Sequence, residues 1–220
     1  LYWQPKCTVE VLKGLPVPNG RGRWAVNAER RALAAEVFAA GREHDAAQSD
    51  RLARFRNLEP ETGELLGVLV RASQAKRVLE IGTSNGYSTL WLGDAVQATG
   101  GHMVTLELDP RRTELARENL ERAGLADVVD CRTIGAAQAL TEQPSGTWDL
   151  VFLDAERPEY PGYWRQLRRV LAPGAMLAID NAISHESELT GFRALLDEDP
   201  GIESALVPIG AGLIVAVFSP

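Results

Sequence analysis

The stretch VLEIGTSNGYS, residues 78–88, decides the fold of this chain. Its first residues form a short apolar run, which predicts a buried strand ending at Gly82, and a helix is predicted to begin near Gly86. Glycines are needed where a chain turns sharply or where its backbone must approach a ligand closely. Such a loop in a parallel sheet predicts a ligand site at the carboxyl ends of the strands.

Strand and helix patterns alternate on both sides of this loop, from residue 59 to residue 218. This alternation implies right-handed βαβ units and a mostly parallel sheet with helices on both faces. Two successive strands at the end imply one antiparallel strand, so we predict an α/β protein with a seven-stranded sheet. The strands are expected at 77–81, 103–108, 128–134, 148–153, 175–179, 202–208 and 213–218, and the helices from Pro60 and at 87–96, 110–123, 136–141, 161–171 and 187–197.

Residues 1–56 do not share this pattern and are predicted to form an N-terminal extension, which leaves 57–220 as the main domain. Residues 1–23 are rich in proline and glycine and predict an irregular arm. The spacing of apolar residues over 24–55 favours two helices, with Gly41 as the break between them.

The formal net charge of −7 argues against nucleic acid as a partner, because no basic excess exists to neutralise phosphates. No run of 18 apolar residues and no charged-then-apolar leader is present, so we expect neither a membrane span nor a signal peptide. A cytoplasmic enzyme is the simplest interpretation of these features.

Two acidic residues, Glu80 and Glu107, are candidate contacts for a ligand bound at the glycine loop. The spacing acidic-x-Gly-x-x-x-Gly differs from the Gly-x-Gly-x-x-Gly pattern of dinucleotide sites, and Glu80 suits the cationic end of a ligand better than a phosphate. Glu107 ends the second predicted strand, where a carboxylate can accept hydrogen bonds from ribose hydroxyls. Asp109 is the alternative, but its position favours the N-cap of the next helix.

Three oxygen-bearing residues end two further predicted strands. Asp154 follows the fourth strand, and Asp180 and Asn181 follow the fifth. Carboxylate and amide oxygens are hard ligands, which suit Mg²⁺, Mn²⁺ or Ca²⁺. A helix cap or a cofactor contact is the alternative for Asp154, and a simple turn is the alternative for the other two.

Residues 57–218 resemble the cation-dependent O-methyltransferases related to catechol and caffeoyl-coenzyme A O-methyltransferases, and their small bacterial relatives most of all. These are class I S-adenosylmethionine (SAM)-dependent methyltransferases with a Rossmann-like fold. The matching stretches are Glu59-Pro60-Glu61-Thr62-Gly63, Leu79-Glu80-Ile81-Gly82-Thr83, Gly86-Tyr87-Ser88, Asp149-Leu150-Val151-Phe152-Leu153-Asp154-Ala155, Tyr160-Pro161, and Pro173-Gly174 leading to Asp180-Asn181.

The resemblance implies methyl transfer from SAM to a hydroxyl of a small catechol-like aromatic acceptor. It also implies a divalent cation at Asp154, Asp180 and Asn181, and a homodimer. The cofactor contacts that it implies, together with the rest of the glycine loop, are Glu80, Gly82, Thr83, Ser84, Gly86, Ser88, Glu107, Gln138 and Asp154. The aromatic residues near the fourth strand that can pack on the acceptor are Tyr160, Tyr163 and Trp164.

The sequence departs from the family at Arg157. Relatives often carry a lysine three residues after the strand-four aspartate, where it acts as a base, whereas arginine stays protonated. Arg157 can orient the acceptor or stabilise a phenolate. Three interpretations stay open: the metal at Asp154 acidifies the hydroxyl, a base such as His185 assists, or the acceptor needs little activation. The alternative for His185 is a surface residue at the start of a helix. The alternatives are a metal-independent or non-catalytic SAM-binding protein and a nicotinamide-dependent oxidoreductase.

Overall fold

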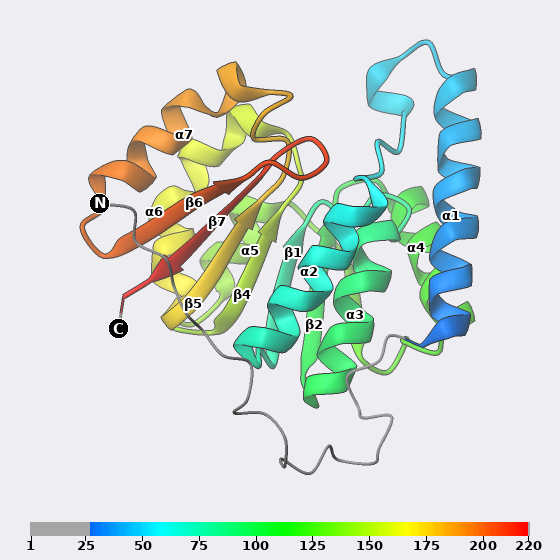
Figure 1. Cartoon of the computed structure of the whole chain (residues 1–220), viewed down its shortest axis with the longest axis horizontal. Helices are drawn as coiled ribbons and strands as arrows, with labels where there is room; N and C mark the ends of the chain where they lie inside the picture. Colours follow the sequence, from blue (N-terminus) through cyan, green and yellow to red (C-terminus); the bar gives the residue numbers. More distant parts are fainter. Residues whose placement is uncertain (1–26, 220) are drawn as a thin grey trace, which may run out of the picture.

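The computed structural model describes residues 27–219 of the chain. Strands and helices alternate as the sequence predicts, and the sheet runs through the middle of the molecule with helices on either side (Figure 1). The expected arm over residues 1–23 lies outside the described residues. No helix within residues 27–219 combines the length and the apolar character needed to cross a bilayer.

The seven strands form one sheet with the order β3-β2-β1-β4-β5-β7-β6. The pairs among β1 to β5 are parallel, and β7 runs antiparallel to both β5 and β6. The prediction of one antiparallel strand is therefore confirmed. The strands are β1 Arg77–Ile81, β2 His102–Glu107, β3 Val129–Thr133, β4 Trp148–Leu153, β5 Leu171–Ile179, β6 Ile202–Val207 and β7 Leu213–Phe218.

The helices cover both faces of the sheet. One apolar cluster joins one face to α1, α2, α3 and α4, and a second joins the other face to α5, α6 and α7. The helices are α1 Ala28–Ala47, α2 Pro60–Ser73, α3 Tyr87–Thr99, α4 Pro110–Arg122, α5 Ala136–Glu142, α6 Tyr160–Val170 and α7 Glu186–Glu198, with short 3₁₀ turns at Arg51–Ala53 and Arg157–Glu159.

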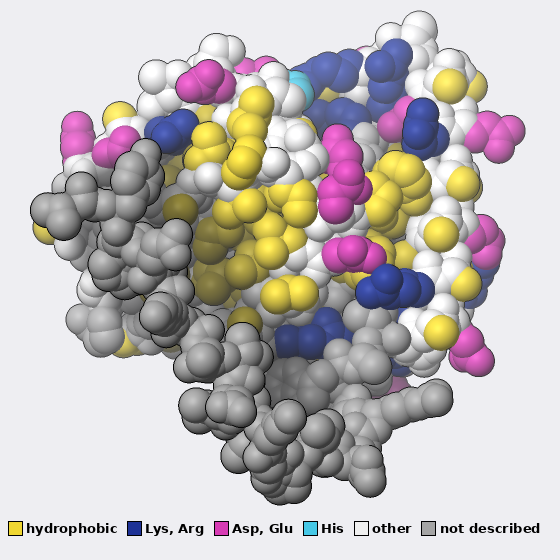
Figure 2. Space-filling view, viewed as in Figure 1, with side chains coloured by type: hydrophobic (Ala, Val, Ile, Leu, Met, Phe, Trp, Pro, Cys, Tyr) yellow, Lys and Arg dark blue, Asp and Glu magenta, His cyan; other side chains and the backbone are white. Residues whose placement is uncertain are grey.

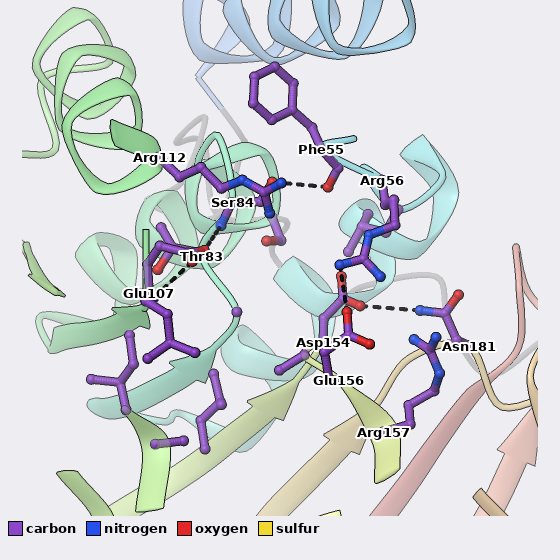
Figure 3. Close-up of a pocket in the computed structure, with 18 of the residues that line it drawn as sticks. Phe55, Arg56, Thr83, Ser84, Glu107, Arg112, Asp154, Glu156, Arg157 and Asn181 are labelled. Carbon is purple, nitrogen blue, oxygen red and sulfur yellow. Dashed lines mark hydrogen bonds and ion pairs between the residues drawn. The ribbon is translucent and has the colours of Figure 1, made fainter. Parts of the chain in front are cut away.

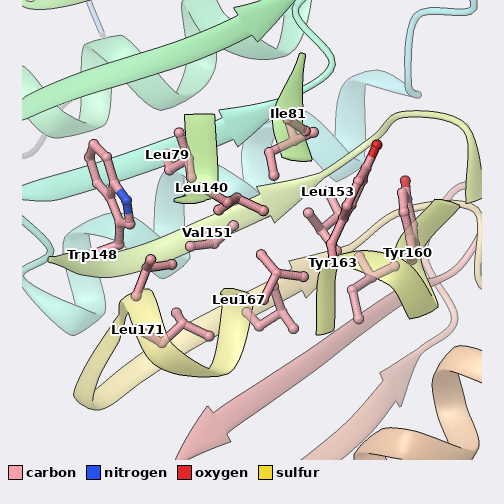
Figure 4. Packing of buried hydrophobic residues seen from close by; sticks show 14 of the residues in the cluster. Leu79, Ile81, Leu140, Trp148, Val151, Leu153, Tyr160, Tyr163, Leu167 and Leu171 are labelled. Atoms are coloured by element: carbon pink, nitrogen blue, oxygen red, sulfur yellow. The ribbon is translucent and has the colours of Figure 1, made fainter. Parts of the chain in front are cut away.

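Strand β4 shows why the sheet is buried on both sides. Successive side chains of a strand point to opposite faces. Val151 and Leu153 lie in the cluster with α5 and α6 (Figure 4), whereas Leu150 and Phe152 lie in the cluster on the other face. All four are fully buried, which explains why the strand reads as a continuous apolar run.

The structure corrects the prediction for the N-terminal extension. Helix α1 runs unbroken through Gly41, and the expected second helix is reduced to the 3₁₀ turn Arg51–Ala53. Gly41 is buried, and a Cβ atom there would lie 2.3 Å from the side-chain nitrogen of Asn57. The glycine therefore permits a close approach to the following loop and does not break the helix.

Strand β5 also begins earlier than predicted. The predicted helix 161–171 and strand 175–179 leave Pro173 and Gly174 in the connection between them, but the strand starts at Leu171. Its pairing with β4 shifts register between Leu171 and Met176. The two residues lie within this irregularity, where a proline is tolerated because the regular hydrogen-bond ladder is interrupted.

Helices α1, α2 and α3 are joined by one buried carboxylate. Asp94 of α3 accepts hydrogen bonds from Arg30 of α1 at 2.8 Å and from Arg71 of α2 at 2.5 Å. All three side chains are at most 14% exposed. Removing the charge of Asp94 leaves two buried cations without their partner.

We predict that Asp94→Asn lowers the free energy of unfolding by about 3 kcal/mol, because loss of one partner leaves buried charge uncompensated. Urea unfolding followed by circular dichroism measures the change. The control is Glu36→Gln, which breaks the exposed pair with Arg122 and should cost less than about 0.5 kcal/mol. Equal losses in the two variants would contradict the structural role of Asp94.

Candidate active site

A cavity of about 480 Å³ opens at the carboxyl ends of β1, β2 and β4. In this sheet the strand order changes direction between β1 and β4, and such a switch point is where open α/β sheets bind ligands. The walls come from the glycine loop after β1, the end of β2, the segment after β4, the start of the loop after β5 and the segment 51–58. Figure 3 shows how these segments converge.

The glycine loop begins with a turn that only glycine allows. Gly82 has φ +108°, and a Cβ atom there would lie 2.1 Å from the carbonyl oxygen of Asp154. Its backbone N–H donates to the carbonyl of Leu106 at 3.0 Å. Gly86, at φ +84°, marks the start of α3. The loop thus brings the ends of β1, β2 and β4 together around the cavity.

Glu107 lies at the end of β2 with its carboxylate held by backbone. It accepts N–H bonds from Ser84 at 2.8 Å, from Leu108 at 2.8 Å and from Asp109 at 3.0 Å. These bonds fix its orientation at the cavity wall (Figure 3). Asp109 instead accepts from the backbone N–H of Arg111 as the N-cap of α4, as predicted.

Glu80 is the predicted residue that the structure places beneath the loop. Its carboxylate is completely buried and accepts bonds from the hydroxyls of Ser88, Thr89 and Thr105 at 2.5–2.6 Å. Burial raises the pKa of Glu80 to about 7, although the three hydroxyls oppose the shift. Glu80 is absent from the cavity wall within the described structure, so it supports the loop from behind and does not face the cavity.

The three predicted metal ligands do come together. The side-chain nitrogen of Asn181 lies 3.2 Å from Oδ1 of Asp154 and 3.0 Å from Oδ2 of Asp180. Burial raises the pKa of Asp154 to about 6 and that of Asp180 to about 8. Asp154 is partly open to the cavity but lies deep in the protein, whereas Asp180 is 2% exposed.

This group fits a divalent cation. Oδ1 of Asp180 is buried without a hydrogen-bond partner among the described residues, and a cation would satisfy it. The oxygen and nitrogen of an Asn side chain are assigned from hydrogen bonding, and a half-turn of the amide directs the Asn181 oxygen to the carboxylates. Over residues 27–219, no group of three or more His, Cys, Asp or Glu side chains is placed to hold a metal, so a cation at this place would need the Asn181 oxygen beside the two carboxylates.

Two further predicted catalytic residues, Arg157 and His185, line the same cavity as Asp154. Arg157 is 3% exposed, and its Nε donates to Glu188 at 2.8 Å. His185 lines the same cavity, and its Nδ1 lies 2.8 Å from the hydroxyl of Ser184. Burial, together with the positive charge of Arg157, lowers the pKa of His185.

Most of the predicted site residues reach the cavity, and four do not. Gly86 and Glu80 lie behind the loop, and Asp180 lies behind Asp154 and Asn181. Gln138 is exposed on α5 and donates to Glu142, because the helix turns it away from the cavity. The residues that line the wall are Gly82, Thr83, Ser84, Ser88, Glu107, Asp154, Arg157, Asn181 and His185.

Segment 51–58 forms a wall that the sequence did not predict. Arg51 and Arg56 pair with Glu156 at 3.0 and 2.9 Å, which ties the segment to the loop after β4. The hydroxyl of Ser84 donates to the carbonyl of Phe55, and Arg112 donates to the carbonyls of Leu52 and Arg54. The signal that could have identified this wall is its cluster of arginines beside an aromatic residue.

Comparison with known proteins identifies close relatives. The model of a family described as O-methyltransferase matches residues 37–217. The catechol O-methyltransferase of Niastella koreensis is 38% identical over 166 residues, 69% of this chain and 75% of that protein. That of Mycobacterium tuberculosis is 36% identical and covers 80% of this chain and 81% of its own length. The crystal structure of a Bacillus cereus O-methyltransferase in complex with SAH superposes with a TM-score of 0.72 and 27% identity, over 86% of this chain and 91% of that one.

We predict that Glu80→Gln becomes more stable relative to the wild type as pH rises from 4.5 to 7. Burial raises the pKa of this carboxyl to about 7 in the folded chain, from an ordinary value of 4.5. The folded wild type therefore binds more protons, and its free energy of unfolding falls across this window by at most about 1.4 kcal/mol per pH unit.

Chemical unfolding of both proteins at several pH values measures this difference, since glutamine does not titrate. Glu36→Gln, at an exposed position on α1, is the control for the loss of a carboxylate that is not buried. A free-energy difference between Glu80→Gln and the wild type that stays the same from pH 4.5 to 7 would show that folding does not raise the pKa of Glu80.

Proposed function

Because this chain belongs to the O-methyltransferase family, we propose that it transfers a methyl group from SAM to a hydroxyl of a small catechol-like aromatic acceptor, assisted by a divalent cation. The observation that carries this proposal is the convergence of a glycine loop, Glu107 and the Asp154–Asn181 group on one cavity. The relatives named catechol O-methyltransferase support the acceptor class. Family membership also argues against the oxidoreductase alternative.

The cofactor is proposed to lie along the glycine loop. Glu107 would accept both ribose hydroxyls, and the backbone of Gly82 with the hydroxyl of Ser88 would face the amino-acid end of SAM. Ile134 and Ala136 line the cavity beyond Glu107, and we assign the adenine to them in place of Gln138. When bound, SAM supplies a methyl group on a positively charged sulfur.

The divalent cation is proposed to bind Asp154, Asp180 and Asn181. Such an ion would lower the pKa of an acceptor hydroxyl and hold its oxygen in place. The protein must then align this oxygen with the methyl group and exclude water, which lowers the entropic cost of the reaction. The 51–58 segment contributes to this exclusion, because its ion pairs with Glu156 hold it across the cavity.

Among the three aromatic residues predicted near the acceptor, Tyr163 is the one that lines the cavity in the described structure. Its ring can pack against an aromatic acceptor, and its hydroxyl donates to Glu159. Trp164 packs edge-to-face against Phe192 at 5.7 Å between ring centroids, in the core. Tyr160 is fully buried and bonds to the backbone of Ala155.

A metal-independent reaction is the second candidate, because Arg157 can neutralise an acceptor oxygen without a cation. A homodimer, a cytoplasmic location and the division of the chain at residue 56 stay predictions.

We predict that Glu107→Gln weakens SAM binding about 10- to 100-fold, because one carboxylate oxygen is replaced by a donor that cannot accept the ribose hydroxyl. Calorimetric titration with SAM measures the dissociation constant. Glu114→Gln, an exposed change on the neighbouring helix α4, is the matched control and should bind as the wild type does. Unchanged affinity in Glu107→Gln would contradict the assignment of the ribose site.

We predict that EDTA removes catechol methylation while SAM still binds, and that added Mg²⁺ restores the activity. The reason is that the proposed ion holds the acceptor, whereas the cofactor contacts come from the glycine loop and Glu107. Turnover is followed by chromatography of the methylated product, and binding by calorimetry. Full activity in EDTA would favour the metal-independent candidate.

A further inference from the structure

Arg157 is a buried cation with an unused donor. Its side chain is 3% exposed, it lines the cavity, and its Nη2 has no hydrogen-bond partner among residues 27–219. A buried donor left unpaired is costly, and a charged donor more so. Figure 3 shows its guanidinium directed toward the region of Asp154 and Asn181. A molecule that binds beside Asp154 can therefore supply the missing acceptor.

The acids around Arg157 are already engaged. Glu188 of α7 accepts from Nε of Arg157. Glu156 is shared by Arg51 and Arg56. Glu159 accepts from the hydroxyl of Tyr163. Asp154 and Asp180 belong to the proposed cation site. Basic side chains also gather at the upper edge of the molecule (Figure 2), and five arginines line the cavity, so an anionic acceptor would meet cationic side chains there.

The cavity offers little that can take a proton from a phenol. Arginine is not deprotonated in proteins. Within residues 27–219 the sole lysine is Lys76, which precedes β1 at the end of the sheet opposite the cavity. The nitrogen base that lines the cavity in the described structure is His185, which lies at the start of α7 and is only partly buried.

We propose that Arg157 binds the acceptor as a phenolate through its free Nη2, so that the enzyme selects phenols that ionise readily and uses no protein base for the methylated hydroxyl. The hydroxyl proton passes to the solvent before transfer. The phenolate oxygen then forms a bond to the methyl carbon as the methyl–sulfur bond breaks, which leaves a methyl ether and the neutral thioether SAH. This inference rests on the proposed function.

The first test observes the ionisation of a bound acceptor without turnover. The visible absorbance of 4-nitrocatechol changes when it loses a proton, and SAH in place of SAM prevents reaction. With Mg²⁺ in every sample, the apparent pKa of the bound phenol should rise by about one to two units in Arg157→Gln, because a charge-assisted hydrogen bond is lost. Arg157→Lys should restore part of the shift.

The control for charge is Arg165→Gln, an exposed position on α6 that lies outside the cavity wall, which should leave the absorbance titration unchanged. SAH binding and melting temperature of each variant show that the fold is retained. If Arg157→Gln binds SAH normally and the bound phenol titrates as in the wild type, the inference is overturned while the proposed function stands. If the wild type does not bind SAH, both the proposed function and this inference are contradicted.

The second test is the pH dependence of kcat/KM for catechols with different phenol pKa values. With no protein base, the acidic limb of the profile should move with the pKa of each free acceptor. A limb that stays at one pH for all acceptors would overturn the proposal, and its disappearance in His185→Gln would identify His185 as the base. A dihydroxybenzoate tests whether Arg157 binds a carboxylate instead of a phenolate. If Arg157→Gln weakens binding of the dihydroxybenzoate and leaves binding of 4-nitrocatechol unchanged, the phenolate assignment is wrong.

Discussion

The close packing of the carboxyl ends of β1, β4 and β5 is the constraint on which the site depends. The backbone N–H of Asp154 donates to Ile81 at 3.0 Å, and that of Asp180 donates to Leu153 at 3.1 Å. Gly82 sits against the Asp154 carbonyl, where any side chain would clash. The same contacts that hold the strands in register therefore place the glycine loop beside the two aspartates.

The site also contains several ionisable groups that are buried away from water. Glu80, Asp154 and Asp180 are carboxyls whose pKa burial raises. Three hydroxyls satisfy Glu80, and in our proposal a cation satisfies the two aspartates. Arg157 is the cationic counterpart, because its guanidinium is buried with one donor free. Ligand-binding sites often contain buried polar groups without hydrogen-bond partners, because the ligand supplies the missing partners when it binds.

The sequence predicted the sheet well because its strands are short apolar runs bounded by glycine, proline or charged residues; β1, β4 and β7 match their predicted bounds. It also predicted which side chains meet at the strand ends, since parallel strands share one edge. The sequence-based prediction failed where the spacing of apolar residues suggested a helix that does not form. Leu52 and Phe55 are three residues apart, as in an α-helix, yet the segment forms a 3₁₀ turn at Arg51–Ala53 and is held at the cavity wall by side-chain bonds from Ser84 and Arg112.

Other errors have the same origin. Gly41 was interpreted as a helix break because glycine is unfavourable in a helix, but the packing of α1 against Asn57 decides the position. Gln138 is turned to solvent by a helix phase that sequence spacing does not fix. Glu80 was expected to face the ligand, and its burial depends on hydroxyls from α3 and β2 that only the fold brings together.

The most direct test of the account is incubation of the chain with catechol, Mg²⁺ and SAM that carries an isotopic label in its methyl group, followed by mass spectrometry of the products. The account predicts one labelled methyl group on a catechol oxygen and an equal amount of SAH. Absence of labelled product, together with absence of SAM binding in the same samples, would contradict it.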